Sequence, residues 1–280
     1  MVRQPAVAGT FYPADAAALR QTVKQLLALS VAPFETVPPK ALIVPHAGYV
    51  YSGPVAGHAY AQLVAHAATI RRVILLGPTH RVPVRGIALP DADAFATPLG
   101  EVPIDQDAIR RLAKISQVVV YDAAHAFEHS LEVQLPFLQS VLNDFTLVPL
   151  AVGDATATEV AGVLEVLWGG PETLIVISSD LSHYLPYDVA RQVDDETVGR
   201  ILCCRQLNSF EQACGALPIN GLLLAAGRHK LTPKLVSQCN SGDTAGDRRR
   251  CLDGRSFGGG RHRILRSGSE SFQHRGLRPF

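Results

Sequence analysis

Four stretches of the sequence place a reactive side chain directly after a short apolar run. His46 follows ALIVP, His80 follows VILLGPT and Cys239 follows KLVSQ. The fourth run, LIVISS, leads into Asp180 and His183 of SSDLSHY. Ligands of open α/β sheets bind outside the carboxyl ends of the strands. If the four runs are strands, two imidazoles, a thiol and a carboxylate with a third imidazole meet at one rim.

This combination of side chains is one that binds transition metals. Two neutral imidazoles and an anionic third ligand form a facial set that leaves positions open, as in non-haem iron sites. A thiolate in place of the carboxylate shifts the preference toward zinc or copper. A lone histidine at a strand end is usually structural, but the convergence of several such residues predicts a metal site or a metal-like polar site at this rim.

The SSDLSHY segment suggests acid/base chemistry. Asp180 and His183 are three residues apart, a spacing at which they face each other across one helical turn. A carboxylate that orients an imidazole forms a general acid/base pair or supports a metal ligand from behind. The alternative is that Ser179 or Asp180 caps a short helix.

A second histidine cluster lies in HAFEHSLEVQ. His125 and His129 are four residues apart, as are Glu128 and Glu132, so the segment could hold a metal on one helix face. The order of these residues differs from the HExxH motif. Because the segment follows the VVVYD run, we predict that Glu128 and His129 support the site or bind substrate, and that His125 is structural or solvated.

Two tyrosines and three further cysteines complete the candidates. Tyr49 and Tyr51 follow His46 in PHAGYVYSG and could supply phenolic donors or apolar pocket walls. Cys203, Cys204 and Cys214 lie in partly apolar stretches with helical patterns, and we predict that they are buried as small hydrophobic residues.

The elements that must position these residues alternate along the chain. Apolar, branched runs predict strands at Ala41–Val44, Val73–Leu76, Val118–Tyr121, Thr146–Val152, Leu174–Ile177 and Lys234–Gln238. Amphipathic stretches predict helices at Ala16–Leu29, Val55–Ala67, Gln106–Ile115, Glu132–Leu142, Thr158–Leu167, Asp188–Cys204 and Asn220–His229. This alternation predicts one α/β domain with a mostly parallel or mixed central sheet flanked by helices.

Composition narrows the functional classes. The chain has 280 residues, 47% hydrophobic and 18% charged, with a formal net charge of +1, so it can build a core but has no overall field for nucleic acid or anionic lipid. Five cysteines without a CxxC pair, no signal peptide and no apolar run of membrane-spanning length favour a cytoplasmic location. Phosphate-loop, dinucleotide-binding, nucleophile-elbow and kinase motifs are all absent from the sequence.

The C-terminal segment differs from the rest. From Asp247 onward the sequence holds nine Arg, no Lys and three acidic residues, while Ala and Val disappear. We therefore divide the chain into a domain at 1–247 and an Arg/Gly/Ser-rich tail at 248–280, expected to be disordered because it offers little apolar area. We hypothesise that the tail is a shifted reading frame; the alternative is a basic tail that contacts nucleic acid or an acidic partner.

Several motifs in one order resemble the Memo family, called AmmeMemoRadiSam system protein B in bacteria and archaea. They are AGTFYPAD, PHAGYVYSGPVAGHAY, GPTH, EHSLEVQLPFL, SSDLSHY and CNSGDTAGD, and they span nearly all of residues 1–247. The resemblance implies a fold similar to class III extradiol ring-cleaving dioxygenases. It also implies His46, His80 and Cys239 as metal ligands, with Asp180 and His183 alongside. The dioxygenases have a carboxylate as the third ligand, so the thiol is a departure from their iron site.

These expectations combine into a functional hypothesis. The resemblance links such proteins to iron or copper and to redox chemistry, and prokaryotic ones to radical-SAM and AMMECR1-like neighbours. We expect a dioxygenase-like pocket that holds iron or copper, with zinc as a third option, and acts on an unknown small molecule; His183, oriented by Asp180, would be the acid/base group. The alternatives are a non-catalytic module that binds an anionic or aromatic ligand or a partner protein, and a zinc hydrolase. We expect no membrane or specific nucleic-acid partner.

Overall fold

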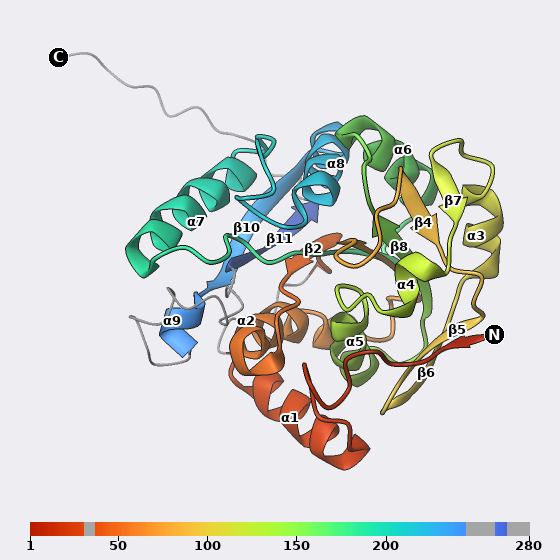
Figure 1. The fold of residues 1–280 in the computed structure, drawn as a ribbon, viewed down its shortest axis with the longest axis horizontal. Coiled ribbons are helices and arrows are strands. Elements are labelled where there is room, and N and C mark those ends of the chain that lie inside the picture. The colour runs from red at the N-terminus through yellow and green to blue at the C-terminus, as the bar shows by residue number, and fades with distance from the viewer. Residues whose placement is uncertain (31–36, 245–260, 268–280) are drawn as a thin grey trace.

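A central sheet of eight strands, in the order β10-β11-β2-β9-β3-β8-β4-β7, organises the molecule (Figure 1). The computed structural model describes residues 1–30, 37–244 and 261–267. The central strands are β2 (Ala41–Val44), β3 (Arg72–Pro78), β4 (Ile87–Leu89), β7 (Val118–Val120), β8 (Thr146–Val152), β9 (Thr173–Ser178), β10 (Leu231–Gln238) and β11 (Arg261–Ser267). A small second sheet contains β1 (Val2–Arg3), β5 (Ala94–Thr97) and β6 (Gly100–Pro103).

The middle strands are buried on both faces. In β3, Val73 and Leu75 belong to one hydrophobic core, whereas Ile74 and Leu76 belong to the other. This division follows from the two-residue period of a strand, which points successive side chains to opposite faces. It explains why the sequence of such a strand is a continuous apolar run.

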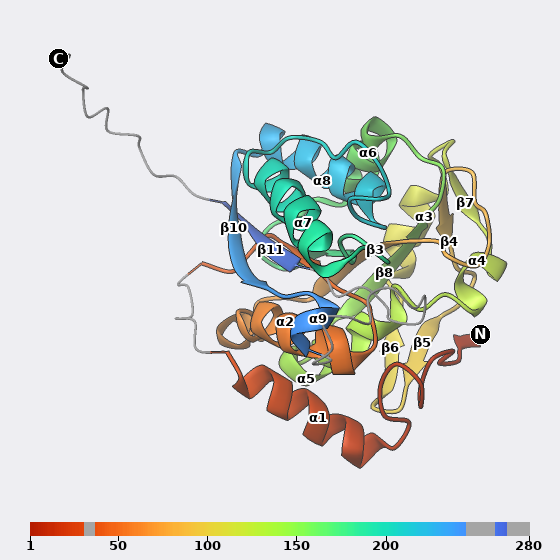
Figure 2. The ribbon, with the colours of Figure 1, turned by 60° about the vertical axis from the view of Figure 1, so that its left-hand side comes forward.

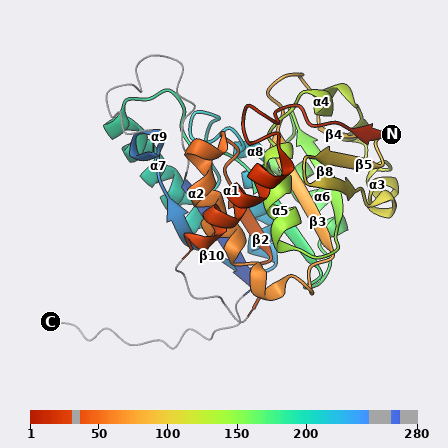
Figure 3. The ribbon, with the colours of Figure 1, turned by 90° about the horizontal axis from the view of Figure 1, so that it is seen from below.

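Helices cover each face of the sheet. The first layer contains α1 (Ala16–Ala28), α2 (Tyr49–Ala61) and α5 (Leu135–Val141), which Figure 3 shows in front of the sheet. The second contains α3 (Gln106–Leu112), α6 (Ala157–Leu167), α7 (Tyr187–Leu202) and α8 (Ala216–Arg228), with α7 and α8 on the opposite side in Figure 2. The part of the chain that the structure describes also contains the short helices α4 (Ala123–Ala126), α9 (Ser241–Thr244), η1 (Val64–His66) and η2 (Glu132–Gln134). The two cores therefore lie between the sheet and its two helical layers, in one α/β unit.

The strand directions bring the expected segments to one edge of the sheet. Strands β2, β9, β3 and β8 are parallel to one another, so their carboxyl ends lie at the same rim. Strand β11 is antiparallel to both β2 and β10, which makes β10 run in the same direction as β2. Because β4 pairs antiparallel with β8, the sheet is mixed, as predicted.

Helix α2 begins earlier than the sequence pattern indicates. The predicted helix starts at Val55, but the observed one starts at Tyr49 and contains Pro54. Proline cannot donate to the carbonyl four residues earlier, which belongs to Val50. Val50 is 78% exposed, so solvent can replace the lost hydrogen bond. Tyr49 consequently lies on a helix and not in a loop beside His46.

Part of the C-terminal tail is ordered, in contrast to our expectation. Residues 261–267 form β11 and pair with both β10 and β2. Disorder was expected from the loss of apolar residues, but backbone hydrogen bonds to two neighbouring strands do not depend on side-chain composition. The rest of the predicted tail, 248–260 and 268–280, lies outside the described residues, and the reading-frame hypothesis stays a prediction.

Across residues 1–30, 37–244 and 261–267, we find no helix with the length and apolar character needed to traverse a bilayer.

The two-sided burial of the central strands predicts a large difference between core and surface truncations. Leu75 of β3 has no exposed surface, whereas Leu29 at the end of α1 is 50% exposed. We expect Leu75→Ala to lower the free energy of unfolding by about 2–5 kcal/mol and Leu29→Ala by less than about 1 kcal/mol. Urea unfolding followed by circular dichroism measures both values. Equal losses would contradict the described packing of β3.

Candidate metal centre

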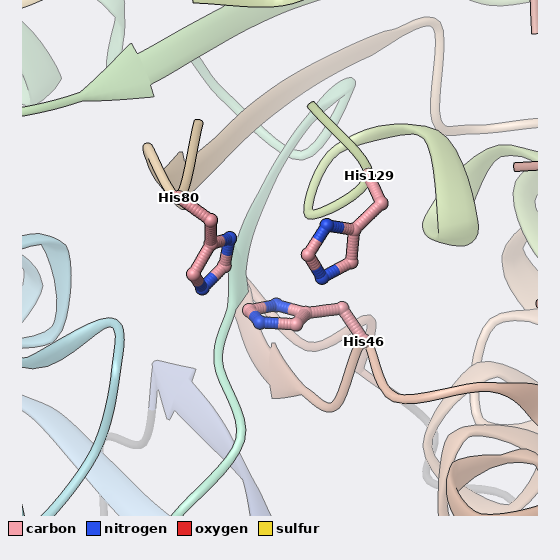
Figure 4. Close-up of side chains that lie close together, drawn as sticks. All are labelled: His46, His80 and His129. Atoms are coloured by element: carbon pink, nitrogen blue, oxygen red, sulfur yellow. The ribbon is translucent and has the colours of Figure 1, made fainter. Parts of the chain in front are cut away.

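Three histidines converge at the carboxyl rim of the sheet. His46 follows β2, His80 follows β3, and His129 lies in the segment between α4 and η2 (Figure 4). One ring nitrogen from each lies within 4.8 Å of the other two. The ring centroids are 5.2 Å apart for His46 and His80, 5.3 Å for His46 and His129, and 4.7 Å for His80 and His129. This group could hold a metal ion.

The hydrogen bonds around His46 fix which of its ring nitrogens carries the proton. The Ser178 hydroxyl donates its single hydrogen to the carbonyl of Ser130 at 2.5 Å. The Gln134 amide donates to Ser178 Oγ at 2.8 Å and to the carbonyl of Pro45 at 2.7 Å. His46 Nδ1, 2.8 Å from Ser178 Oγ, must therefore be a donor as well. This tautomer leaves the lone pair on Nε2, where a metal could bind.

A buried carboxylate orients His80. Glu128, 2% exposed, accepts hydrogen bonds from the backbone N–H groups of His80, His129 and Ser130 at 2.5, 3.0 and 2.9 Å. It also accepts one from His80 Nδ1 at 2.9 Å. Burial alone would raise the pKa of Glu128, but the hydrogen bonds and charge of His80 outweigh it and lower the pKa to about 2. The carboxylate therefore stays ionised and leaves Nε2 of His80 for a ligand.

His129 provides the test of whether these residues suit a metal. Its Nδ1 is buried and has no hydrogen-bond partner, although Glu128 Oε1 is 3.3 Å away. Burial lowers the pKa of His129 to about 4, so the ring is neutral near pH 7. A neutral, incompletely partnered imidazole beside two oriented ones matches the donor set that iron, copper and zinc accept. His129 was predicted to support the site or bind substrate, and the structure groups it with the candidate ligands.

Asp180 supports His46 in a way that its spacing from His183 did not indicate. Asp180 Oδ1 accepts the backbone N–H groups of His46 and Ala47 at 2.9 and 3.3 Å. Its Oδ2 is 3.9 Å from His46 Nε2, and burial raises the pKa of this carboxyl, partly offset by the charge of His183. Residues 179–186 contain no helix, so both the helical-turn and the N-cap interpretations are wrong. Asp180 instead fixes the turn that carries His46.

His183 is partly exposed and lies outside the three-histidine group. Its ring centroid is 5.9 Å from that of Tyr184, which has a left-handed backbone with φ of 57°. The charge of His183 acts on the buried carboxyl of Asp180, so the two are electrostatically linked. Their assignment as a catalytic pair stays a prediction.

Cys239 and Cys214 lie at different places relative to the three histidines. Cys239 follows β10 at the same rim but is not a member of the group of close ligand atoms found among the described residues. Its role as a ligand stays a prediction. Cys214, predicted to be an inert hydrophobic residue, has its Sγ 3.3 Å from His46 Nε2 and 3.7 Å from the carbonyl of Asp180.

The position of Cys214 beside His46 was not predicted because this cysteine belongs to the helical layer. It precedes α8 instead of following a strand. The neighbouring Gly215 permits the approach, since a Cβ there would lie 2.6 Å from the Cβ of Ser179. Burial, followed by the charge of Asp180, raises the pKa of the Cys214 thiol to about 12. In the sequence, the one signal of the contact between Cys214 and His46 was the glycine directly after Cys214.

The remaining candidates have mainly structural contacts. Tyr49 donates from its hydroxyl to the carbonyl of Val133 at 2.8 Å and is 5% exposed, so it belongs to the core. Tyr51 is half-buried on α2, and its role in the pocket stays a prediction. His125 is buried with Nε2 3.0 Å from the carbonyl of Ala88, as a structural role requires. Glu132 accepts from two backbone N–H groups and Tyr12, and pairs with Arg3, which anchors the N-terminal segment.

The His46 tautomer can be measured directly. In metal-free protein, two-dimensional ¹H–¹⁵N spectra should show His46 protonated at Nδ1 and unprotonated at Nε2. Ser178→Ala removes the acceptor and should weaken metal binding by about 10- to 100-fold. Ser116→Ala, at an exposed position, serves as the control. A proton on Nε2 in the parent protein would contradict the assignment.

The depressed pKa of Glu128 predicts acid sensitivity. A carboxyl whose folded pKa is about 2 stabilises the fold above its usual pKa, and this contribution is lost as the pH falls from about 5 to 2. We expect metal-free protein to lose on the order of 3 kcal/mol of unfolding free energy through this group over that window. In Glu128→Gln the unfolding free energy should fall less over this pH window, because the ionised carboxylate is absent. In the exposed control Glu101→Gln it should fall as much as in the parent protein. Denaturant unfolding at each pH measures these free energies. Identical pH profiles for Glu128→Gln and the parent protein would refute the prediction.

Comparison with known proteins identifies relatives along most of the chain. A family model described as "Memo-like protein" matches residues 3–251. A MEMO1 family protein of Sulfolobus acidocaldarius is 34% identical, over 89% of this chain and 95% of its own. Those of Aquifex aeolicus and Methanococcoides burtonii are 36% and 37% identical, each over 88% of this chain and at least 94% of theirs.

A solved structure is similar in fold. The uncharacterized protein JW3007 from Escherichia coli K12 superposes with a TM-score of 0.52, covering 81% of this chain and 98% of that chain. At 15% sequence identity the likeness concerns the fold alone. The match of the family model to nearly the whole domain, together with relatives above 30% identity, confirms the resemblance seen in the motifs: the chain belongs to the Memo-like protein family.

Proposed function

We propose that the protein is a metal-dependent oxidoreductase that binds iron or copper at His46, His80 and His129 and acts on a small molecule. The observation that carries the proposal is the convergence of three ring nitrogens within 4.8 Å of one another. Imidazole suits iron, copper and zinc, so zinc remains a third candidate. A three-histidine set leaves coordination positions open for a substrate.

The chain's own residues prepare this site in three ways. Ser178 and Glu128 orient His46 and His80 through their Nδ1 atoms, which presents Nε2 to an ion. His129 is neutral, so it binds a cation without first losing a proton. Bound iron or copper would supply one-electron and dioxygen chemistry.

Acid/base chemistry has one candidate pair in the neighbourhood. Asp180 is buried, and His183 is partly exposed, so His183 can exchange protons with solvent. We propose His183 as the proton-transfer group, with the Asp180 carboxyl holding the His46 turn in place. Among the described residues, the free thiols of Cys203, Cys204 and Cys214 support a reducing, cytoplasmic setting.

Metal analysis of protein purified without oxygen tests the proposal. We expect about one iron or copper per chain, and each of His46→Ala, His80→Ala and His129→Ala should lower retention by at least tenfold. Cys239→Ser and Cys214→Ser, measured alongside, establish whether either thiol contributes. His66→Ala, a half-buried histidine on η1, is the matched control and should retain metal.

The outcomes separate the alternatives. Metal-free protein in every preparation would refute the proposal. The non-catalytic binding module would then be the remaining alternative. Stoichiometric zinc with no redox-active metal would favour hydrolysis. Loss of metal in Cys239→Ser but not in His129→Ala would return the ligand set to His46, His80 and Cys239.

A further inference from the structure

A cavity of about 540 Å³ lies beside the metal centre. Its apolar walls include Pro83, Val84, Val152, Phe210, Leu217 and Pro218. Ligand pockets typically have a mostly apolar lining, a few polar groups and a volume of about 300–1,000 Å³. The size and lining of this cavity fit a small organic molecule.

The cavity reaches the candidate metal ligands. His80 lines it directly, and so does Cys214, whose Sγ is 3.3 Å from His46 Nε2. The side chain of His80 is 29% exposed, compared with 13% for His129 and 2% for His46. The metal centre therefore opens on the side of His80, toward the cavity.

One acidic residue lines the cavity, on a segment whose backbone is held by hydrogen bonds. Asp154 is the only Asp, Glu, Lys or Arg among the described residues that line the cavity. Its backbone N–H donates to Val84 at 2.7 Å, and its carbonyl accepts from Gly86 at 2.9 Å. The contact with Val84 is close enough that a Cβ on Gly153 would lie 2.0 Å from the Val84 carbonyl. The backbone that carries the Asp154 carboxylate is therefore held in place.

Phe210 is the second unusual feature of the cavity. It lines the wall and yet is 63% exposed. An apolar molecule in the cavity would remove part of this aromatic surface from water, which favours binding.

We propose that this cavity is the ligand pocket of the metal centre, and that it takes a molecule with an apolar body, a metal-binding head beside His80 and a cationic group at Asp154. The inference rests on the proposed function, since the head requires a metal at the three histidines. It specifies the ligand more narrowly than that function does. A molecule with an anionic end would meet the Asp154 carboxylate without a compensating cation from the cavity wall.

A hydroxamate series on zinc-loaded protein tests the pocket without relying on turnover. Isothermal titration calorimetry would compare acetohydroxamate with octanohydroxamate, and with octanohydroxamates that end in an amine or a carboxylate. We expect octanohydroxamate to bind at least tenfold tighter than acetohydroxamate, and the amine at least tenfold tighter than the carboxylate.

Two variants locate the effects within the cavity. Leu217→Trp should remove the advantage of the long chain and leave acetohydroxamate binding unchanged, whereas Leu202→Trp, outside the cavity, should remove nothing. Asp154→Asn should reduce the preference for the amine to about twofold or less, and Asp144→Asn, away from this cavity, should preserve it. The Asp154 variant changes an exposed side chain, so it keeps the test valid if Leu217→Trp does not fold.

The results that would overturn the proposal distinguish failure of the pocket from failure of the metal function. Binding of acetohydroxamate with no gain from the longer chain, or equal binding of amine and carboxylate, would exclude this pocket and leave the metal function standing. Protein that holds none of iron, copper or zinc and binds no hydroxamate would refute the metal function and the pocket together.

Discussion

The candidate centre depends on one buried carboxylate. Glu128 accepts four hydrogen bonds, two from His80, one from His129 and one from Ser130, and in doing so closes the segment that carries His129 against the end of β3. An ionised carboxylate can remain in such a place only because its acceptor sites are filled. Without it, His80 would lose its orientation, and the backbone N–H groups of the His129 segment would be buried without partners.

The rest of the fold supplies the frame around this contact. Parallel strands bring His46, His80 and Asp180 to one rim, and two helical layers exclude water from the sheet below them. The hydroxyl of Ser178 then joins β9 to Gln134 on η2 and to His46 after β2. His46 and His80 are therefore each held by a hydrogen bond from a segment other than their own, which is how preorganised metal sites are generally supported.

The sequence predicted most of the frame and part of the site, for physical reasons. Apolar runs identify strands that are buried on both faces, and the strand-end rule then locates His46, His80 and Asp180. The rule cannot place His129, which comes from an irregular segment fixed by Glu128, or Cys214, which arrives from the helical layer. Strands β4, β5 and β6 were not predicted because their sequences, IAL, AFAT and GEVP, lack the run of branched apolar residues that identified the equally short β2 and β7. Strand β11 was not predicted either, because its backbone hydrogen bonds to β10 and β2 do not depend on amino-acid composition.

The position of Cys214 has a consequence for the chemical character of the site. Imidazoles at the sheet rim and a thiol carried by the segment before α8 face each other only while the helical layer stays packed on the sheet. Loosening of that layer would withdraw the soft sulfur before it disturbed the nitrogens. The contact between Cys214 Sγ and His46 Nε2 therefore depends on the packing of the helical layer, so partial unfolding of that layer would change the surroundings of the three histidines while the sheet rim stays in place.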